Sequence, residues 1–260
     1  MTFKKHIPNL LTLGNLLCGT IAAIAAVNAD YVMAGSFVVL GIVFDFFDGF
    51  AARILKVSGE LGKQLDSLAD MVTSGVVPGI IMFKLLAIHT TLDPTESSSL
   101  AVVRGEDMMF VSIGDTSFSL LQFFGLLLTL AACYRLANFN IDTRQSDSFI
   151  GLPTPAMSLF VISLPLIQMY AGYEFLDSLL RNSYFLIGVT VVLSYLMNAE
   201  IPLFSLKFKT FTFRENKLKY LFLMGSLVML FTLKVIAIPS ILVVYVLLSI
   251  ASNVLQRSPE

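Results

Sequence analysis

The chain has 260 residues, of which 56% are hydrophobic and only 13% are charged, and its mean hydropathy is +0.82. A soluble domain carries about 25% charged residues, so this composition excludes a soluble globular protein and predicts an all-α, polytopic membrane protein. The formal net charge of −1 argues against nucleic acid as a partner. Cys18 and Cys133 lie in apolar stretches and are expected to be buried thiols without a disulfide framework.

Apolar stretches of span length predict a bundle of about eight transmembrane helices, because roughly 17–25 residues are needed to cross a bilayer. They are expected near 8–28, 31–55, 62–88, 118–140, 152–173, 179–198, 217–235 and 237–255. The first span follows a short basic start but has no convincing cleavage site, so we expect it to be retained rather than removed as a signal peptide. Residues 1–200 are expected to form a core of six spans, and residues 201–260 to add a basic connector and two C-terminal spans.

The Lys and Arg residues predict the orientation of these spans. With an even number of spans both termini lie on one side, which collects Lys4, Lys5, Arg53, Lys56, Lys63, Arg135, Arg144, Lys207, Lys209, Arg214, Lys217, Lys219 and Arg257. The other side keeps Lys84, Arg104, Arg181 and Lys234. By the positive-inside rule the first side is cytoplasmic. We therefore expect an integral inner-membrane protein with both termini in the cytoplasm and the polar insertion 89–117 outside.

The first span carries a polar seam, in which Asn9, Thr12 and Asn15 recur every three residues. Asn9 can cap the helix, and Thr12 and Asn15 can join it to a neighbouring helix by hydrogen bonds. The alternative is that Thr12 and Asn15 line a binding site.

The stretch DFFDGFAARILKVSGELGKQLDSLAD, residues 45–70, places four carboxylates in or beside apolar runs, where charge is costly and usually functional. Asp45 and Asp48 share one helix face, and Asp66 and Asp70 share a face of the next helix. Gly59 permits a turn between the two helices, so their acidic faces can oppose each other. Any one Asp is explained equally well by solvation at a helix end, but four together, without a neighbouring Lys or Arg on the helix face of Asp45 or Asp48, indicate a bound cation.

Oxygen ligands without Cys or His favour a hard ion, so we predict Mg²⁺ or Mn²⁺ at these four carboxylates. Two ions roughly 3.5–4 Å apart would suit the number of ligands and would serve phosphoryl chemistry.

The same stretch fits the pattern D-x-x-D-G-x-x-A-R-x(8)-G-x(3)-D-x(3)-D at every fixed position. This pattern resembles the signature of the CDP-alcohol phosphotransferases, which are integral membrane enzymes of phospholipid synthesis. The resemblance implies that Asp45, Asp48, Asp66 and Asp70 bind the metal ions and that Asp70 also accepts a proton from the acceptor hydroxyl. It also places polar residues of the first helix at the nucleotide site, which favours that role for Thr12 and Asn15.

Four further signature residues have two interpretations each. Gly49, Ala52 and Gly62 are small, which permits close helix packing; the resemblance implies that they also leave room for a cytosine ring or a pyrophosphate. Arg53 can be a topology charge, or it can hold a phosphate one turn beyond the acids.

The segment YRLANFNIDTRQSDSFIGLPTPA, residues 134–156, narrows the resemblance to membrane-embedded phosphatidylserine synthases, over spans one to five. That resemblance implies CDP-diacylglycerol and L-serine as substrates, phosphatidylserine and CMP as products, and a homodimer among membrane lipids. Arg135 and Arg144 can clamp the serine carboxylate or can be topology charges. The basic connector 199–216, with its KFKTFTF pattern, can form a short strand or lie on anionic headgroups.

Two other functions remain open on the residues alone. The same chemistry can serve another acceptor, such as glycerol 3-phosphate or inositol phosphate, although a phosphorylated acceptor would call for more basic residues. A divalent-metal transporter is disfavoured because transporters usually show internal repeats with broken helices, and the later spans carry no second acidic pair.

Overall fold

Helices make up almost all of the described structure, a computed structural model that describes residues 3–57, 59–88, 110–113, 116–142, 149–203 and 216–257. The α-helices are α1 (Phe3–Val27), α2 (Tyr31–Leu55), α3 (Glu60–Asp70), α4 (Val77–Ile88), α5 (Leu127–Ile141), α6 (Thr154–Tyr170), α7 (Glu174–Arg181), α8 (Ser183–Asn198), α9 (Lys217–Leu233) and α10 (Ala237–Arg257). A π-helical segment, Met71–Val76, joins α3 to α4, and 3₁₀ segments at Leu120–Leu126 and Lys234–Ile236 precede α5 and α10. The strands form two antiparallel pairs, β1 (Phe110–Ile113) with β2 (Thr116–Ser119) and β3 (Phe149–Ile150) with β4 (Pro202–Leu203).

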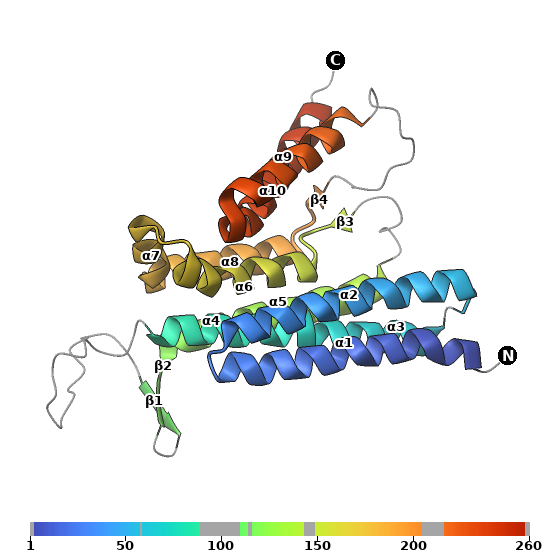
Figure 1. The fold of residues 1–260 in the computed structure, drawn as a ribbon, viewed down its shortest axis with the longest axis horizontal. Helices are drawn as coiled ribbons and strands as arrows, with labels where there is room; N and C mark the ends of the chain where they lie inside the picture. The colour runs from blue at the N-terminus through green and yellow to red at the C-terminus, as the bar shows by residue number, and fades with distance from the viewer. Residues whose placement is uncertain are drawn as a thin grey trace, which may run out of the picture.

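The helices lie in layers (Figure 1). α1 to α5 run side by side as one layer, α6 and α8 lie over it, and the pair α9–α10 rises away from the bundle at an angle. The apolar core runs between α1, α2, α4 and α6, where Ala22, Ala26 and Ala34 are fully buried. Small side chains let α1 and α2 pack closely along their whole length.

Length and apolar composition mark four described helical runs as candidate membrane spans: 6–27, 60–87, 120–141 and 217–253. A fifth results if α7 and α8 count as one broken span. The all-α membrane bundle is therefore confirmed, whereas the predicted number of eight spans is not.

The predicted C-terminal spans 217–235 and 237–255 match α9 and α10, whereas the predicted span 179–198 does not match a single straight helix. α7 and α8 are bent by 77°, because Asn182 Oδ1 accepts the backbone N–H groups of Tyr184 and Phe185 and so starts a new helix inside the predicted span 179–198. α9 and α10 fold back on each other: the rings of Phe222 and Tyr245 lie 5.6 Å apart, on either side of the chain reversal near Lys234.

The predicted span 62–88 is one helical rod interrupted by the π-helical segment. Thr129 Oγ1 of α5 donates to the carbonyl of Gly75 in this segment at 3.0 Å. Gly79, one turn further on, packs so closely on α5 that a Cβ atom there would overlap the Thr129 hydroxyl. The glycines thus let α5 dock against the rod directly beyond the acidic residues.

The remaining expectations concern the two cysteines and the polar segments between the spans. Cys18 is buried as predicted, but Cys133 is exposed on α5, because an apolar stretch that faces lipid needs no protein cover. Most of the predicted insertion 89–117 lies outside the described residues, as do the KFKTFTF pattern and Arg144; the part that is described, 110–113 and 116–117, belongs to β1 and β2.

Candidate active site

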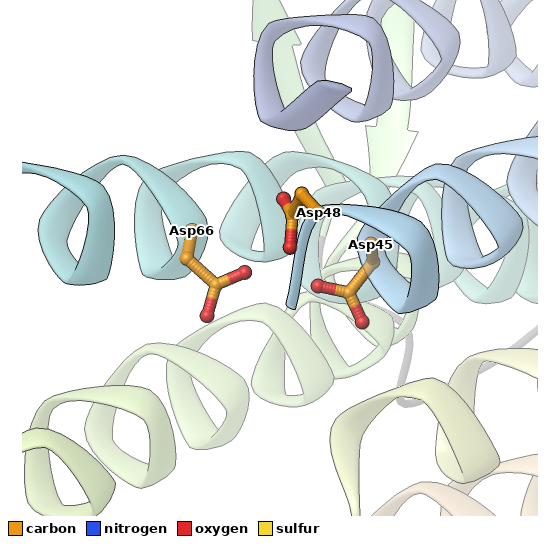
Figure 2. Close-up of side chains that lie close together, drawn as sticks. All are labelled: Asp45, Asp48 and Asp66. Carbon is orange, nitrogen blue, oxygen red and sulfur yellow. The ribbon is translucent and has the colours of Figure 1, made fainter. Parts of the chain in front are cut away.

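Three of the four predicted metal ligands meet between α2 and α3. Asp45 and Asp48 come from α2 and Asp66 from α3, and their carboxylates point toward one another (Figure 2). One oxygen from each lies within 4.8 Å of the others. The turn between the helices uses Lys56 in the left-handed conformation, with φ of 51°, followed by extended Gly59. Local sequence therefore brings the two acidic faces together as the spacing predicted.

Asp70 lies one turn beyond Asp66 and is held by α1. Asn15 Nδ2 donates to Asp70 Oδ1 at 3.1 Å, and the Asn15 side chain is fully buried. Thr73 Oγ1 donates in turn to Asn15 Oδ1 at 2.8 Å, which fixes the amide with its nitrogen toward Asp70. A run of hydrogen bonds thus links the π-helical segment to the carboxylate through the first helix.

Thr12, the other predicted residue of the polar seam, holds Asp48. Its hydroxyl contacts Asp48 Oδ2 and also bonds to the Pro8 carbonyl at 3.1 Å, and the side chain is buried. The seam of α1 therefore faces the acids: Thr12 contacts the acid of α2, and Asn15 contacts the last acid of α3.

One cavity of about 230 Å³ opens beside Asp48 and Asp66. Of the signature residues, Gly49, Ala52 and Gly62 line it, together with Asn9, Thr12 and Lys63. A Cβ atom on Gly62 would sit 3.5 Å from Asn9 Oδ1, so the glycine keeps this wall open. Arg53 does not line this cavity; it is exposed, and its Nε donates to the Gly49 carbonyl at 2.9 Å.

A second cavity, of about 280 Å³, lies on the other side of the acids. Asp45, Asp66 and Asp70 line it, opposite Arg135 of α5 and Thr154 at the start of α6. Asp66 thus borders both cavities, so the carboxylates stand at the junction between two spaces of small-molecule size.

Arg135 is buried and holds three backbone carbonyls. Nη1 donates to Ile150 and Met197 at 3.1 and 3.2 Å, and Nη2 donates to Gly151 at 3.5 Å. A guanidinium has five N–H donors, so two have no partner among the described residues. Sequence reasoning did not anticipate this backbone role.

The donor set fits a divalent cation. Asp66 Oδ1 is buried and has no hydrogen-bond partner among the described residues. Within the same residues none of the four carboxylates forms an ion pair with Lys or Arg. Charged carboxylates that lie close together and partly out of water are stabilised by a bound cation, and clustered oxygen atoms without a cationic side chain match the ligands that Mg²⁺ and Mn²⁺ prefer.

Sequence reasoning missed the residues that tie α5 to α3 beside the site. Lys63 Nζ donates to the Asn140 carbonyl, and Asn140 Nδ2 donates to Ser67 Oγ at 2.8 Å. Asn140 ends the RLANFN stretch, so part of that motif holds α5 against the acidic helix. The available signal was the presence of Asn138 and Asn140 in a stretch that was interpreted only through its arginines.

Comparison with known proteins identifies the family of the chain. The family model described as CDP-alcohol phosphatidyltransferase matches residues 5–196. The CDP-diacylglycerol–serine O-phosphatidyltransferase of Bacillus subtilis is 30% identical over 201 residues, which cover 76% of this chain and 89% of that protein. The Helicobacter pylori (strain J99) protein of the same name is 31% identical over 75% of this chain and 70% of its own length. An archaetidylserine synthase of Methanothermobacter thermautotrophicus is 26% identical over 72% of this chain and 66% of its own. The chain belongs to the CDP-alcohol phosphatidyltransferase family.

Proposed function

We propose that the protein transfers the phosphatidyl group of CDP-diacylglycerol to L-serine, giving phosphatidylserine and CMP. The observation that carries the proposal is the group of Asp45, Asp48 and Asp66 at the junction of two cavities, with Asp70 on the wall of the second. The names of the relatives at about 30% identity supply the donor and the acceptor.

The first cavity binds the nucleotide half of the donor, and the second binds the acceptor. The cavity lined by Gly49, Ala52 and Gly62 has no bulky side chain at those positions and takes the cytidine half of the donor. Lys63 also lines this cavity, and its ammonium, which bonds to the Asn140 carbonyl, is a proposed further partner of the nucleotide phosphate. Arg53 remains a proposed phosphate ligand from the family signature; its exposed guanidinium must turn away from Gly49 to reach the cavity.

The second cavity binds the acceptor, and Asp70 on its wall accepts the proton. The serine hydroxyl oxygen bonds to the phosphatidyl phosphorus, the phosphorus–oxygen bond to CMP breaks, and Asp70 accepts the hydroxyl proton. Asn15 holds the Asp70 carboxylate in place by its 3.1 Å hydrogen bond. The two unused N–H groups of Arg135, on the same cavity, are the proposed partners of the serine carboxylate.

Two Mg²⁺ or Mn²⁺ ions held by Asp45, Asp48, Asp66 and Asp70 would supply positive charge for the pyrophosphate and the leaving CMP. The site is proposed to face the cytoplasm, where nucleotide and serine are available.

An acceptor screen tests this function. Purified protein is given CDP-diacylglycerol with serine, glycerol 3-phosphate, inositol phosphate or ethanolamine, and CMP release is measured with Mg²⁺, with Mn²⁺ and with a chelator. We expect release with serine alone among the acceptors, and none once the metal is removed. Release that follows glycerol 3-phosphate instead would refute the serine assignment, and metal-independent release would refute the metal site.

A further inference from the structure

α6 and the α9–α10 hairpin enclose an apolar groove of about 430 Å³. Ala156 and Leu159 of α6 line one wall, and Leu230 and Ile241 of the hairpin line the other. The hairpin lies outside the residues that match the family model, 5–196. Neither the family signature nor the acids account for this groove.

The groove begins where the acidic cavity ends. Pro153, directly before α6, borders both the groove and the cavity that holds Asp45, Asp66 and Asp70. In the first turn of α6, Thr154 and Pro155 line the cavity, whereas Ala156 lines the groove. A molecule with a polar head at the carboxylates therefore meets an apolar channel within one helical turn.

The shape of the groove suits a hydrocarbon chain. From Pro153 to Leu159 it follows six residues of helix, or about 9 Å. Its lining is apolar apart from the Tyr245 hydroxyl, so it offers an extended alkyl chain contact without polar partners.

We propose that this groove binds one acyl chain of the CDP-diacylglycerol donor, so that the C-terminal hairpin forms part of the lipid-substrate site. The proposal rests on the proposed function. The phosphorus under attack lies at the carboxylates, and the glycerol that bears both acyl chains is bonded to that phosphate. An acyl chain of the donor therefore starts at the Pro153 end of the groove, whereas a bulk lipid has nothing to anchor its head there.

Chain length provides the test, because a butyryl chain reaches only the start of the groove, whereas a palmitoyl chain can run along its length of about 9 Å. Ile241→Trp and Leu230→Trp fill the groove, and Leu221→Trp is the control, a leucine of α9 that is 70% exposed and does not line the groove. CMP release is measured with serine and either dipalmitoyl or dibutyryl CDP-glycerol in detergent. The two groove variants are expected to raise KM for the dipalmitoyl donor about tenfold and to leave KM for the dibutyryl donor within about twofold.

Different outcomes would overturn the groove proposal and the proposed function. An unchanged ratio of the two KM values in both groove variants, or the same change in Leu221→Trp, would overturn the proposal and leave the groove to bulk lipid. Both variants are made because a folding defect in one, seen as lost activity with the short donor, leaves the other to decide. Absence of serine-dependent CMP release by the unaltered protein would refute the proposed function instead.

Discussion

At the scale of single residues, the four carboxylates are not equivalent. Asp45, Asp48 and Asp66 approach one another within 4.8 Å, whereas Asp70 is bonded by Asn15 and borders only the second cavity. This separation is consistent with three acids that chiefly hold metal and a fourth that also moves a proton.

Replacing each acid in turn by Asn removes a negative ligand while keeping the side-chain size. We expect Asp45→Asn, Asp48→Asn and Asp66→Asn to lower CMP release by at least about a hundredfold, because a two-ion site depends on each charge. Asp177→Asn is the matched control, since that acid forms its ion pair with Arg181 on α7 and lines neither cavity beside the acids. Near-normal activity in two of the three at ordinary metal concentrations would exclude the two-ion site.

Thr73 is expected to act on Asp70 through Asn15. Thr73→Val keeps the shape of the side chain but removes the hydroxyl that orients the Asn15 amide. Without it Asn15 can turn its oxygen toward Asp70, so we expect kcat to fall about tenfold with both KM values nearly unchanged. Thr73→Ser, which keeps the hydroxyl, should restore most of kcat. A rise in KM at constant kcat would place Asn15 in substrate binding instead.

Arg135→Lys tests the proposed serine contact. Lysine cannot form two parallel bonds to a carboxylate, and such a contact is worth about 1.5–3 kcal/mol, so KM for serine should rise roughly ten- to a hundredfold. KM for the lipid donor should stay nearly constant. Because Arg135 also bonds three carbonyls, thermal unfolding is measured in parallel. A loss of stability with an unchanged KM for serine would leave the residue only its backbone role.

At the scale of helices, α1 and α2 approach closely at the site because glycine occupies the contact. A Cβ atom on Gly41 of α2 would lie 2.8 Å from Asn15 Oδ1 and 2.9 Å from Thr73 Cγ2. The backbone of α2 at Gly41 therefore packs directly against the two residues whose hydrogen bonds orient Asp70.

Gly41→Ala should separate these helices slightly. We expect a loss of about 1–3 kcal/mol in unfolding free energy from overpacking, with a fall in kcat from the displaced Asn15. Gly188→Ala in α8 is the matched control, because a Cβ atom there meets nothing within 4 Å, and helix propensity favours alanine by roughly 0.5–1 kcal/mol. Thermal unfolding in detergent and CMP release measure both effects; equal behaviour of the two variants would contradict the close contact.

The acidic helices could be predicted because their information is local. α2 runs from Tyr31 to Leu55, as predicted, and spacings of three and four residues put the acids on shared faces. The bond between Thr73 and Asn15 could not be predicted, because it joins residues 58 apart and a buried threonine in an apolar run has no distinctive pattern. The bend before α8 was missed because Asn182 was treated as part of an apolar span rather than as a cap.

At the scale of the whole molecule, orientation is tested by labelling. In a Cys133→Ser background, an impermeant maleimide should label Ser178→Cys of α7 on intact cells, and Glu60→Cys of α3 only after permeabilisation. Both positions are exposed, and the distribution of Lys and Arg residues predicts that they lie on opposite sides of the membrane. The reverse pattern would put the acids on the outer face, away from cytosolic nucleotide.

The division into a core at 1–200 and an added unit at 201–260 stays a prediction, as does the homodimer. Removal of residues 201–260 tests the division, and crosslinking in native membranes tests the homodimer.

The π-helical segment Met71–Val76 determines how the helix before it, α3, is rotated about the common axis relative to the helix after it, α4. An α-helix turns about 100° per residue, so one additional residue in a turn swings everything beyond it by that amount. Before the segment the rod presents Asp66 and Asp70 to the second cavity, and beyond it Gly79 meets Thr129 of α5. Deleting one residue here would leave both halves helical and equally apolar, yet would aim one of them in the wrong direction. Such a deletion would therefore abolish activity, although the hydropathy profile of the chain would stay almost the same.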